Sequence, residues 1–194
     1  DRFSPESATR MEPYLHKAEE FWSAEGNVGR VGEVLALRGM TLFWQGDYKH
    51  AFAYAYQSLE MLEEHDAHWR AISLLNAAAA DLMAGQIVNA QDKILEGRAL
   101  AGAMQNTYGV LAATQMLGDV FYWQGDHEQA AGIYQQIIED AHGNDSMLDD
   151  QGIAHLGLAN IAYEMNDLAR AEEMANRALS FAQRRANDHL QAQS

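Results

Sequence analysis

The sequence predicts an all-α fold, a stack of antiparallel helical hairpins with about nine helices. Turn signals recur at Gly46, Gly85, Gly125 and Asn166. They are separated by 39, 40 and 41 residues, the spacing of stacked helical-hairpin arrays. Apolar residues with helical spacing flank each turn, which predicts a helix on either side.

Small residues stand at two fixed distances from all four turns. Five residues after each turn is an alanine: Ala51, Ala90, Ala130 and Ala171. Seven residues before each turn is a glycine or alanine: Gly39, Ala78, Gly118 and Ala159. Because small side chains let helix backbones approach closely, these positions predict the contact line between paired helices.

The clearest hairpin lies between Leu117 and Ala141. Leu117, Phe121 and Tyr122 lie on an amphipathic first helix, Gly125 ends that helix, and Asp126 can cap the next. The apolar stripe continues on the second helix with Ala130, Tyr134 and Ile137.

The other elements follow in chain order. Residues 1–10 form a polar lead, and Met11 to Ala24 predict a helix that covers the first hairpin. The glycine-containing segment 26–32 is interpreted as a helix connection, because it lacks the Gly-Lys-Ser/Thr ending of a phosphate loop. The four hairpins are expected at about residues 30–64, 67–104, 107–141 and 149–185.

The connections between hairpins offer helix caps at His65-Asp66 and Asn106-Thr107. The polar segment 143–149 is the longest connection, and we expect it to be the mobile loop. Residues 187–194 predict the beginning of another first helix. We therefore expect residues 1–194 to form a single domain that is a fragment of a longer protein.

The third hairpin resembles the tetratricopeptide repeat. The matching residues are Leu117, Gly118, Phe121, Gly125, Asp126, Ala130 and Tyr134. The resemblance implies a right-handed superhelix. The chain departs from the pattern in its longer period and in the second hairpin, where Asp81 stands in place of a large apolar residue.

The chain as a whole resembles the helical-repeat sensor region of large bacterial regulators related to the maltose activator, which end in a LuxR-type DNA-binding module. The resembling segments are residues 11–22, 33–51 and 152–179. This resemblance implies a non-catalytic domain. In such a regulator, a small effector or an inhibitory protein bound here would shift a linked ATPase and DNA-binding machine between two states.

Composition narrows the classes of function. The chain has 13 basic and 28 acidic side chains, a net charge of −15, so we expect no direct binding of nucleic acid or anionic membranes. The absence of cysteine excludes disulfides, thiolate metal sites and a cysteine nucleophile. No segment approaches 18 apolar residues and the polar N-terminus lacks a signal-peptide core, so we expect a cytoplasmic protein.

Catalytic and metal-binding patterns are missing from the sequence. Neither GxSxG nor HExxH occurs. His65 and His68 form the only close histidine pair, and no other ligand spacing accompanies them, so we interpret them as part of a surface connection. We expect no enzymatic activity, no metal and no cofactor.

The expected binding surface is the concave side, which first helices usually line in such arrays. Counting back from each turn gives the candidate groove residues: Trp44, Asn76, Gln115, Asp119, Tyr122, Trp123, Asn160 and Glu164. Rings can stack on apolar ligand faces while amides and carboxylates fix orientation. The mixture therefore suits a small polyhydroxylated or amide-bearing ligand.

Other interpretations stay open. Phe43, Trp44, Tyr122 and Trp123 can instead pack between helices, and Arg38 is expected to pair structurally with a carboxylate. The domain can also be a scaffold that holds a peptide or another subunit, unrelated to transcription. Without a Lys, Arg and Asn cluster to clamp a carboxylate, such a scaffold would prefer a basic or apolar helix. Self-association is open as well.

Overall fold

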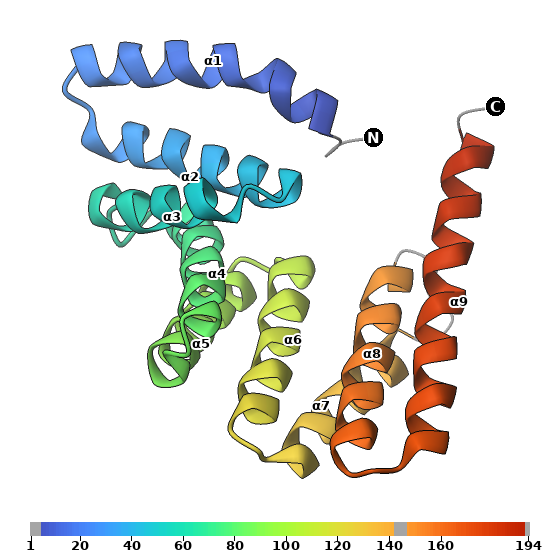
Figure 1. The fold of residues 1–194 in the computed structure, drawn as a ribbon. Coiled ribbons are helices and arrows are strands. Elements are labelled where there is room, and N and C mark those ends of the chain that lie inside the picture. Colours follow the sequence, from blue (N-terminus) through green and yellow to red (C-terminus); the bar gives the residue numbers. More distant parts are fainter. Residues whose placement is uncertain (1–4, 142–146, 193–194) are drawn as a thin grey trace. The chain divides into compact units, whose positions relative to one another are not determined.

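A computed structural model describes residues 5–141 and 147–192, and the described part of the chain contains helices and no strands (Figure 1). The helices are α1 (Pro5–Ala24), α2 (Val28–Gln45), α3 (Tyr48–Met61), α4 (Ala67–Met83), α5 (Ile87–Ala103), α6 (Thr107–Trp123), α7 (His127–Asp140), α8 (Leu148–Glu164) and α9 (Leu168–Ala192). The predicted fold class, an all-α array of antiparallel hairpins, is confirmed.

The chain divides into two compact units, Asp1–Ala113 and Thr114–Ser194, and the division falls inside α6. In the first unit, α2 pairs with α3 and α4 pairs with α5. In the second unit, α8 and α9 lie side by side as an antiparallel pair (Figure 1). Our expectation of a single domain stays a prediction.

The four predicted turns have a left-handed backbone. The φ angles are 81° at Gly46, 73° at Gly85, 79° at Gly125 and 58° at Asn166. Glycine adopts this conformation without strain and asparagine tolerates it. Three of the turns then continue into an aspartate that caps the next helix, accepting a bond from a backbone N–H: Asp47, Asp126 and Asp167.

The small residues lie where the paired helices touch, as predicted. Ala51, Ala90 and Ala130 are fully buried. A Cβ added to Gly39 would lie 3.1 Å from the carbonyl oxygen of Ala51, so α2 and α3 could not approach as closely with a larger residue there.

Two boundaries differ from the prediction. α1 begins at Pro5 instead of Met11, since proline is well suited to the first position of a helix. α2 begins at Val28, so most of segment 26–32 is helical; Gly32 serves packing, because its added Cβ would lie 3.0 Å from Met61. Residues 142–146 of the expected mobile loop lie outside the described residues.

The predicted new helix at residues 187–194 is wrong. α9 continues without a break to Ala192, because residues 168–192 contain neither a glycine nor a proline that would end it. The last two residues lie outside the described part of the chain.

The buried Arg38 joins α1 to the first hairpin. Its guanidinium lies 2.5 Å from a carboxylate oxygen of Glu19 and 3.2 Å from one of Glu12, and it covers the ring of Tyr54. The expected structural pairing of Arg38 with a carboxylate is confirmed. Burial alone would lower the pKa of Arg38, but the hydrogen bond that Arg38 donates to Glu19 and the charge of Glu12 outweigh it and raise that pKa.

Asp81, the departure from the repeat pattern, is buried at the centre of a polar cluster. The ammonium of Lys93 on α5 lies 2.7 Å from its carboxylate, and the hydroxyl of Tyr56 on α3 donates a hydrogen bond to it. Burial and this bond raise the pKa of Tyr56 to about 12. The carboxylate therefore links α3, α4 and α5 by charge where an apolar residue would link them by packing.

We predict that Lys93→Met lowers the free energy of unfolding by about 3 kcal/mol, because it leaves the carboxylate of Asp81 buried without its counter-charge. The double substitution Asp81→Leu with Lys93→Met should recover most of that loss, since no buried charge remains. Urea denaturation of the three proteins measures both values. Arg177→Met, in the exposed Glu173–Arg177 pair, is the control and should cost well under about 1 kcal/mol. Equal losses in the single and double variants would contradict the prediction.

Candidate ligand site at the third and fourth hairpins

The ring of Tyr134 on α7 is clamped between two glycines of neighbouring helices. A Cβ added to Gly118 on α6 would lie 2.7 Å from the ring, and one added to Gly157 on α8 would lie 2.6 Å from it. Both distances are too short for any real side chain. Tyr134 is only 2 % exposed, so the two glycines are what make room for a large ring inside this junction.

The Tyr134 hydroxyl donates a hydrogen bond of 2.6 Å to the carboxylate of Asp119, one residue beyond Gly118 on α6. Burial raises the pKa of Asp119, and the bond from Tyr134 only partly opposes this. Burial and the charge of Asp119 raise the pKa of Tyr134 in turn. The carboxylate is therefore half-buried, with a neutral hydrogen-bond donor as its partner.

A second polar contact links α6 to α8 near the surface. The hydroxyl of Tyr122 donates a hydrogen bond to the carboxylate of Glu164. Burial, the charge of Glu164 and this bond all raise the pKa of Tyr122. Tyr122 also stacks on the ring of His127, at 5.7 Å between ring centres. Three of the predicted groove residues, Asp119, Tyr122 and Glu164, thus belong to one polar junction.

Two further predicted residues lie on the surface of the same unit. Trp123 is 66 % exposed and meets Tyr122 edge to face, at 5.4 Å between ring centres. Asn160 is exposed on α8, one turn before Glu164. Trp123 thus presents an exposed indole next to Tyr122, and its part in a ligand site stays a prediction. The alternative of core packing fails for Trp123, since most of its surface is open to solvent.

The other predicted groove residues are placed less tightly. Trp44 is about half exposed at the end of α2, Gln115 is half-buried on α6, and Asn76 is half-buried on α4. The side-chain amide nitrogen of Asn76 is buried and has no hydrogen-bond partner among the described residues. Trp44 and Asn76 lie in the first unit and Asp119 and Glu164 in the second, so their joint participation in one groove stays a prediction.

The sequence analysis missed the roles of Tyr134 and Gly157. It placed Tyr134 on an apolar stripe, although the hydroxyl is what reaches Asp119. The position nine residues after each turn holds Ala55 in the first hairpin, Ile94 in the second and the much larger Tyr134 in the third. That difference in size was a signal of a special role for Tyr134. Gly157 stands nine residues before the fourth turn and was a second signal.

His155 is a further buried polar residue that sequence reasoning passed over. Its ring stacks on Phe181 of α9 at 5.5 Å between ring centres, and its Nδ1 atom has no partner among the described residues. Burial lowers the pKa of His155, and the nearby positive charge of Arg177 lowers it further. The residue therefore packs as a neutral ring between α8 and α9.

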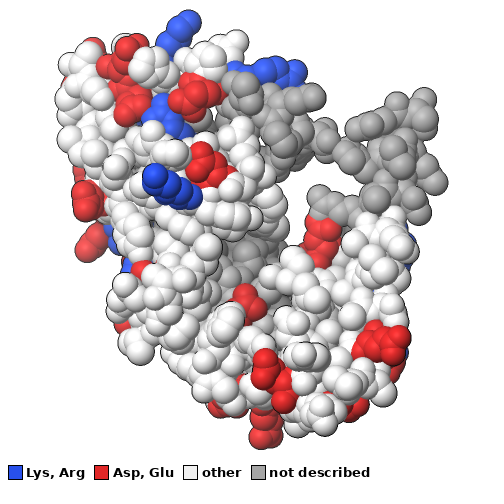
Figure 2. Space-filling view, viewed as in Figure 1, with Lys and Arg blue, Asp and Glu red and all other residues white. Residues whose placement is uncertain are grey.

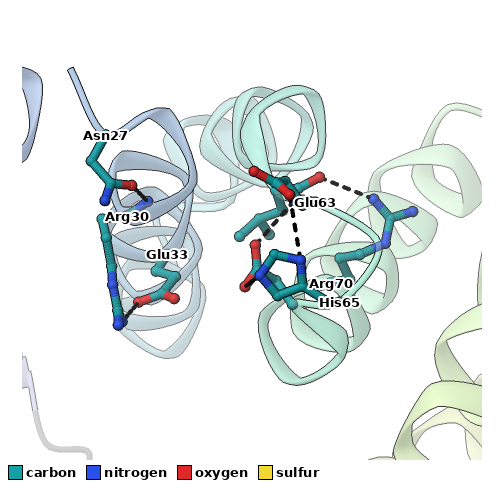
Figure 3. Close-up of polar contacts among 8 residues, drawn as sticks. Asn27, Arg30, Glu33, Glu63, His65 and Arg70 are labelled. Atoms are coloured by element: carbon teal, nitrogen blue, oxygen red, sulfur yellow. Dashed lines mark hydrogen bonds and ion pairs between the residues drawn. The ribbon is translucent and has the colours of Figure 1, made fainter.

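The described residues hold no cluster of three or more histidine, aspartate and glutamate side chains that could bind a metal ion. His65 is an exposed part of the α3–α4 connection and lies 3.4 Å from Glu63 (Figure 3). The ring of His68 meets that of Trp69. His65 thus lies in the surface connection, as we interpreted it, whereas His68 is an exposed residue of the first turn of α4.

Two surface properties bear on the possible partners: the distribution of charge and the apolar character of the helices. Acidic side chains are spread over the face shown in Figure 2 and are not gathered into one patch. Of the helices that the structure describes, none combines the length and the apolar character needed to cross a membrane.

Comparison with protein families shows to which family the chain belongs. A family model described as the MalT-like TPR region matches residues 32–194. The chain belongs to the MalT-like TPR family. The match leaves out α1 and begins inside α2, and it covers all four hairpins of the second to ninth helices. A search of curated proteins gives no match to this MalT-like TPR region.

A solved structure supports the fold. The MalT-like TPR region is similar to the structure titled "Crystal structure of BtubC (BKLC) from P. vanneervenii", with a TM-score of 0.62 and 19 % identity. The similarity covers 92 % of this chain and 72 % of that chain. At this identity the likeness concerns the fold alone.

We predict that Gly157→Ala destabilises the MalT-like TPR region by about 1–3 kcal/mol, because the new methyl group must displace the Tyr134 ring. In a Tyr134→Leu background the same substitution should cost little, since the smaller side chain leaves space. Urea denaturation of the four proteins gives the coupling energy.

Gly132→Ala on α7 is the matched control. No atom lies within 4 Å of its added Cβ, so alanine should stabilise the helix by up to about 1 kcal/mol. A Gly157→Ala cost that is unchanged in the Tyr134→Leu background would show that the ring is not what excludes the methyl group.

Proposed function

We propose that this MalT-like TPR region is the effector-binding region of a LuxR-type transcriptional regulator, and that it carries no chemistry itself. The observation that carries the proposal is the polar junction of Asp119, Tyr122, Tyr134 and Glu164 in a chain of this family. The regulator context rests on the family resemblance. The ligand is a small molecule with several hydroxyl or amide groups.

The burial of Asp119 supports a role beyond folding. Desolvating a carboxylate opposes folding, and one hydrogen bond from a tyrosine hydroxyl offsets only part of that free-energy cost. The raised pKa of Asp119 records this cost. Ionisable groups with such shifts concentrate at functional sites, where binding makes use of them.

The surface around the junction supports the ligand class. Trp123 presents a wide apolar ring to solvent next to Tyr122, and a sugar-like ligand can stack on such a ring. Glu164 and Asn160 stand on the adjacent helix and can accept or donate hydrogen bonds to hydroxyl or amide groups. Asp119 and Glu164 have no arginine partner among the described residues, so they favour donor groups on the ligand over anionic groups.

The same junction gives a route from binding to regulation. A ligand hydroxyl that bonds to Glu164 competes with the hydroxyl of Tyr122, which now joins α6 to α8. Binding would then stabilise one arrangement of the third and fourth hairpins over another. A ligand shifts a linked regulator only through such a difference in affinity between two states.

The rest of the regulator would supply DNA binding. The net charge of −15 makes this segment a poor partner for a phosphate backbone. The linked ATPase and DNA-binding module implied by the resemblance belong to the proposal for the longer protein.

We predict that a small polyhydroxylated or amide-bearing ligand raises the thermal unfolding temperature of the domain, whereas basic and apolar peptides do not. A ligand at 100 times its dissociation constant stabilises the folded state by about 2.7 kcal/mol, which differential scanning fluorimetry resolves. The screen uses one panel of sugars and metabolites and one of peptides.

Variants then locate the site. Trp123→Ala should abolish the ligand-induced shift because it removes the stacking surface, and Asp119→Asn should weaken it while keeping an acceptor for Tyr134. Trp44→Ala is the matched control, since Trp44 stands at the equivalent place before the first turn. Loss of the shift in the Trp44 variant alone would move the site to the first hairpin. A hit confined to peptides would contradict the effector proposal and favour a peptide-binding scaffold.

A further inference from the structure

One long stretch of the chain contains no lysine or arginine. All 13 lysine and arginine residues of the protein lie in residues 1–98 and 170–194. Residues 99–169, which include α6, α7 and α8, contain ten aspartate and glutamate residues and neither of the two basic types. A lysine or arginine that compensates a carboxylate of these three helices must therefore come from another part of the protein.

The first unit compensates carboxylates with its own cations. Asp81 on α4 pairs with Lys93 on α5 at 2.7 Å. Arg70 on α4 pairs with Glu96 on α5 at 3.0 Å. Both ion pairs join the same two helices, so each carboxylate has a positive charge of the protein beside it.

The polar junction of the third and fourth hairpins has carboxylates without such compensation. Asp119 accepts a hydrogen bond from the hydroxyl of Tyr134, and Glu164 accepts one from the hydroxyl of Tyr122. A phenol hydroxyl is a neutral donor, so neither bond brings a positive charge to the junction. Asp119 is half-buried, and a carboxylate that is partly removed from water attracts a nearby cation more strongly than a fully hydrated one does.

An aromatic surface adjoins this junction. The indole of Trp123 is 66 % exposed and meets the ring of Tyr122, whose hydroxyl bonds to Glu164. The face of an indole attracts cations more strongly than other aromatic side chains, because the ring quadrupole places negative charge there. A ring of this kind with an uncompensated carboxylate near it suits an ammonium group, which gains from both.

A metal ion fits the junction less well than an organic cation. The described residues hold no group of three or more histidine, aspartate and glutamate side chains that could bind a metal. Calcium takes about six to eight oxygen ligands, more than two carboxylates that already accept hydrogen bonds supply. An exposed indole adds no ligand to a metal site, but it offers an alkylammonium group a favourable surface.

We propose that the effector of this site is a small organic cation, an amine or a quaternary ammonium compound that also carries hydroxyl or amide groups. This ligand class rests on the proposed function and narrows it. Trp123 covers the ammonium group, Glu164 supplies the counter-charge, and Asp119 adds to the negative potential. The ligand thus brings the positive charge that residues 99–169 lack.

Two matched pairs of compounds test the charge of the ligand. N-methylglucamine is polyhydroxylated and carries an ammonium group, and sorbitol is its neutral counterpart. Choline carries a quaternary ammonium group, and its neutral counterpart is the alcohol in which a tert-butyl group replaces that group. Isothermal titration calorimetry at about pH 8, where an ordinary histidine is neutral and both ammonium groups stay charged, measures each Kd.

We predict that each cation binds at least about tenfold more tightly than its neutral counterpart, because only the cation gains from the carboxylates and the ring quadrupole. The tighter of the two cations shows whether the site prefers a protonated amine or a quaternary ammonium group.

Variants assign the gain to the named side chains. Glu164→Gln should weaken cation binding about tenfold while it keeps an acceptor for Tyr122. Trp123→Leu should weaken it about three- to tenfold, since leucine is apolar but has no quadrupole, and Trp123→Phe should retain part of the affinity. Glu60→Gln removes the same charge from an exposed position in the first unit and should bind like the wild type. Equal losses in the Glu60 and Glu164 variants would overturn the proposal, because net charge alone would then attract the cations.

The neutral compounds separate the ligand class from the proposed function. Sorbitol binding as tightly as N-methylglucamine would overturn the cationic class and leave the proposed function standing with a neutral effector. Binding of neither cation would also overturn the cationic class, and the thermal screen of sugars, metabolites and peptides then tests the proposed function separately. A hit confined to basic peptides in that screen would contradict both.

Discussion

The junction between the third and fourth hairpins depends on one steric constraint, the enclosure of the Tyr134 ring between Gly118 and Gly157. Neither flanking position has room for a Cβ. The enclosed ring fixes the distance of α7 from α6 and α8, and its hydroxyl then reaches Asp119. Packing therefore positions Asp119, Tyr122 and Glu164 independently of their hydrogen bonds. A site built on such a scaffold is preorganised, which favours binding because little remains to be ordered.

Polar groups recur between the described helices, and they differ in whether an opposite charge lies beside them. Arg38 with Glu12 and Glu19, and Asp81 with Lys93, pair opposite charges, so each charge has a counter-charge beside it. Asp119 has only the neutral hydroxyl of Tyr134 as a hydrogen-bond partner among the described residues, and burial raises its pKa. That difference is the reason that Asp119 belongs to the proposed ligand site and the two charge pairs do not.

The sequence was sufficient to predict the turns and the helix pairs of the hairpins. Turn residues with a left-handed backbone, such as Gly46 and Asn166, and fully buried alanines such as Ala51 are local signals that one chain displays. The end of α9 was not predictable from the repeat, because a fifth hairpin seemed due where the helix simply continues. Contacts between hairpins were hardest to predict. The bond between Tyr122 and Glu164 joins residues 42 positions apart. Their distances from the turns placed both residues in the predicted groove but did not predict the contact between them.

The pairing of a large ring with a glycine has a consequence for the history of the array. The corresponding two positions hold Ala55 and Asn76 between the first and second hairpins, but Tyr134 and Gly157 between the third and fourth. The first and third junctions therefore hold different pairs of side-chain volumes. Duplication or shuffling of a single hairpin would set a tyrosine against a residue with no room for it, or a glycine against an empty space. Recombination in such a lineage must exchange whole junctions, and the order of its repeats is consequently hard to change.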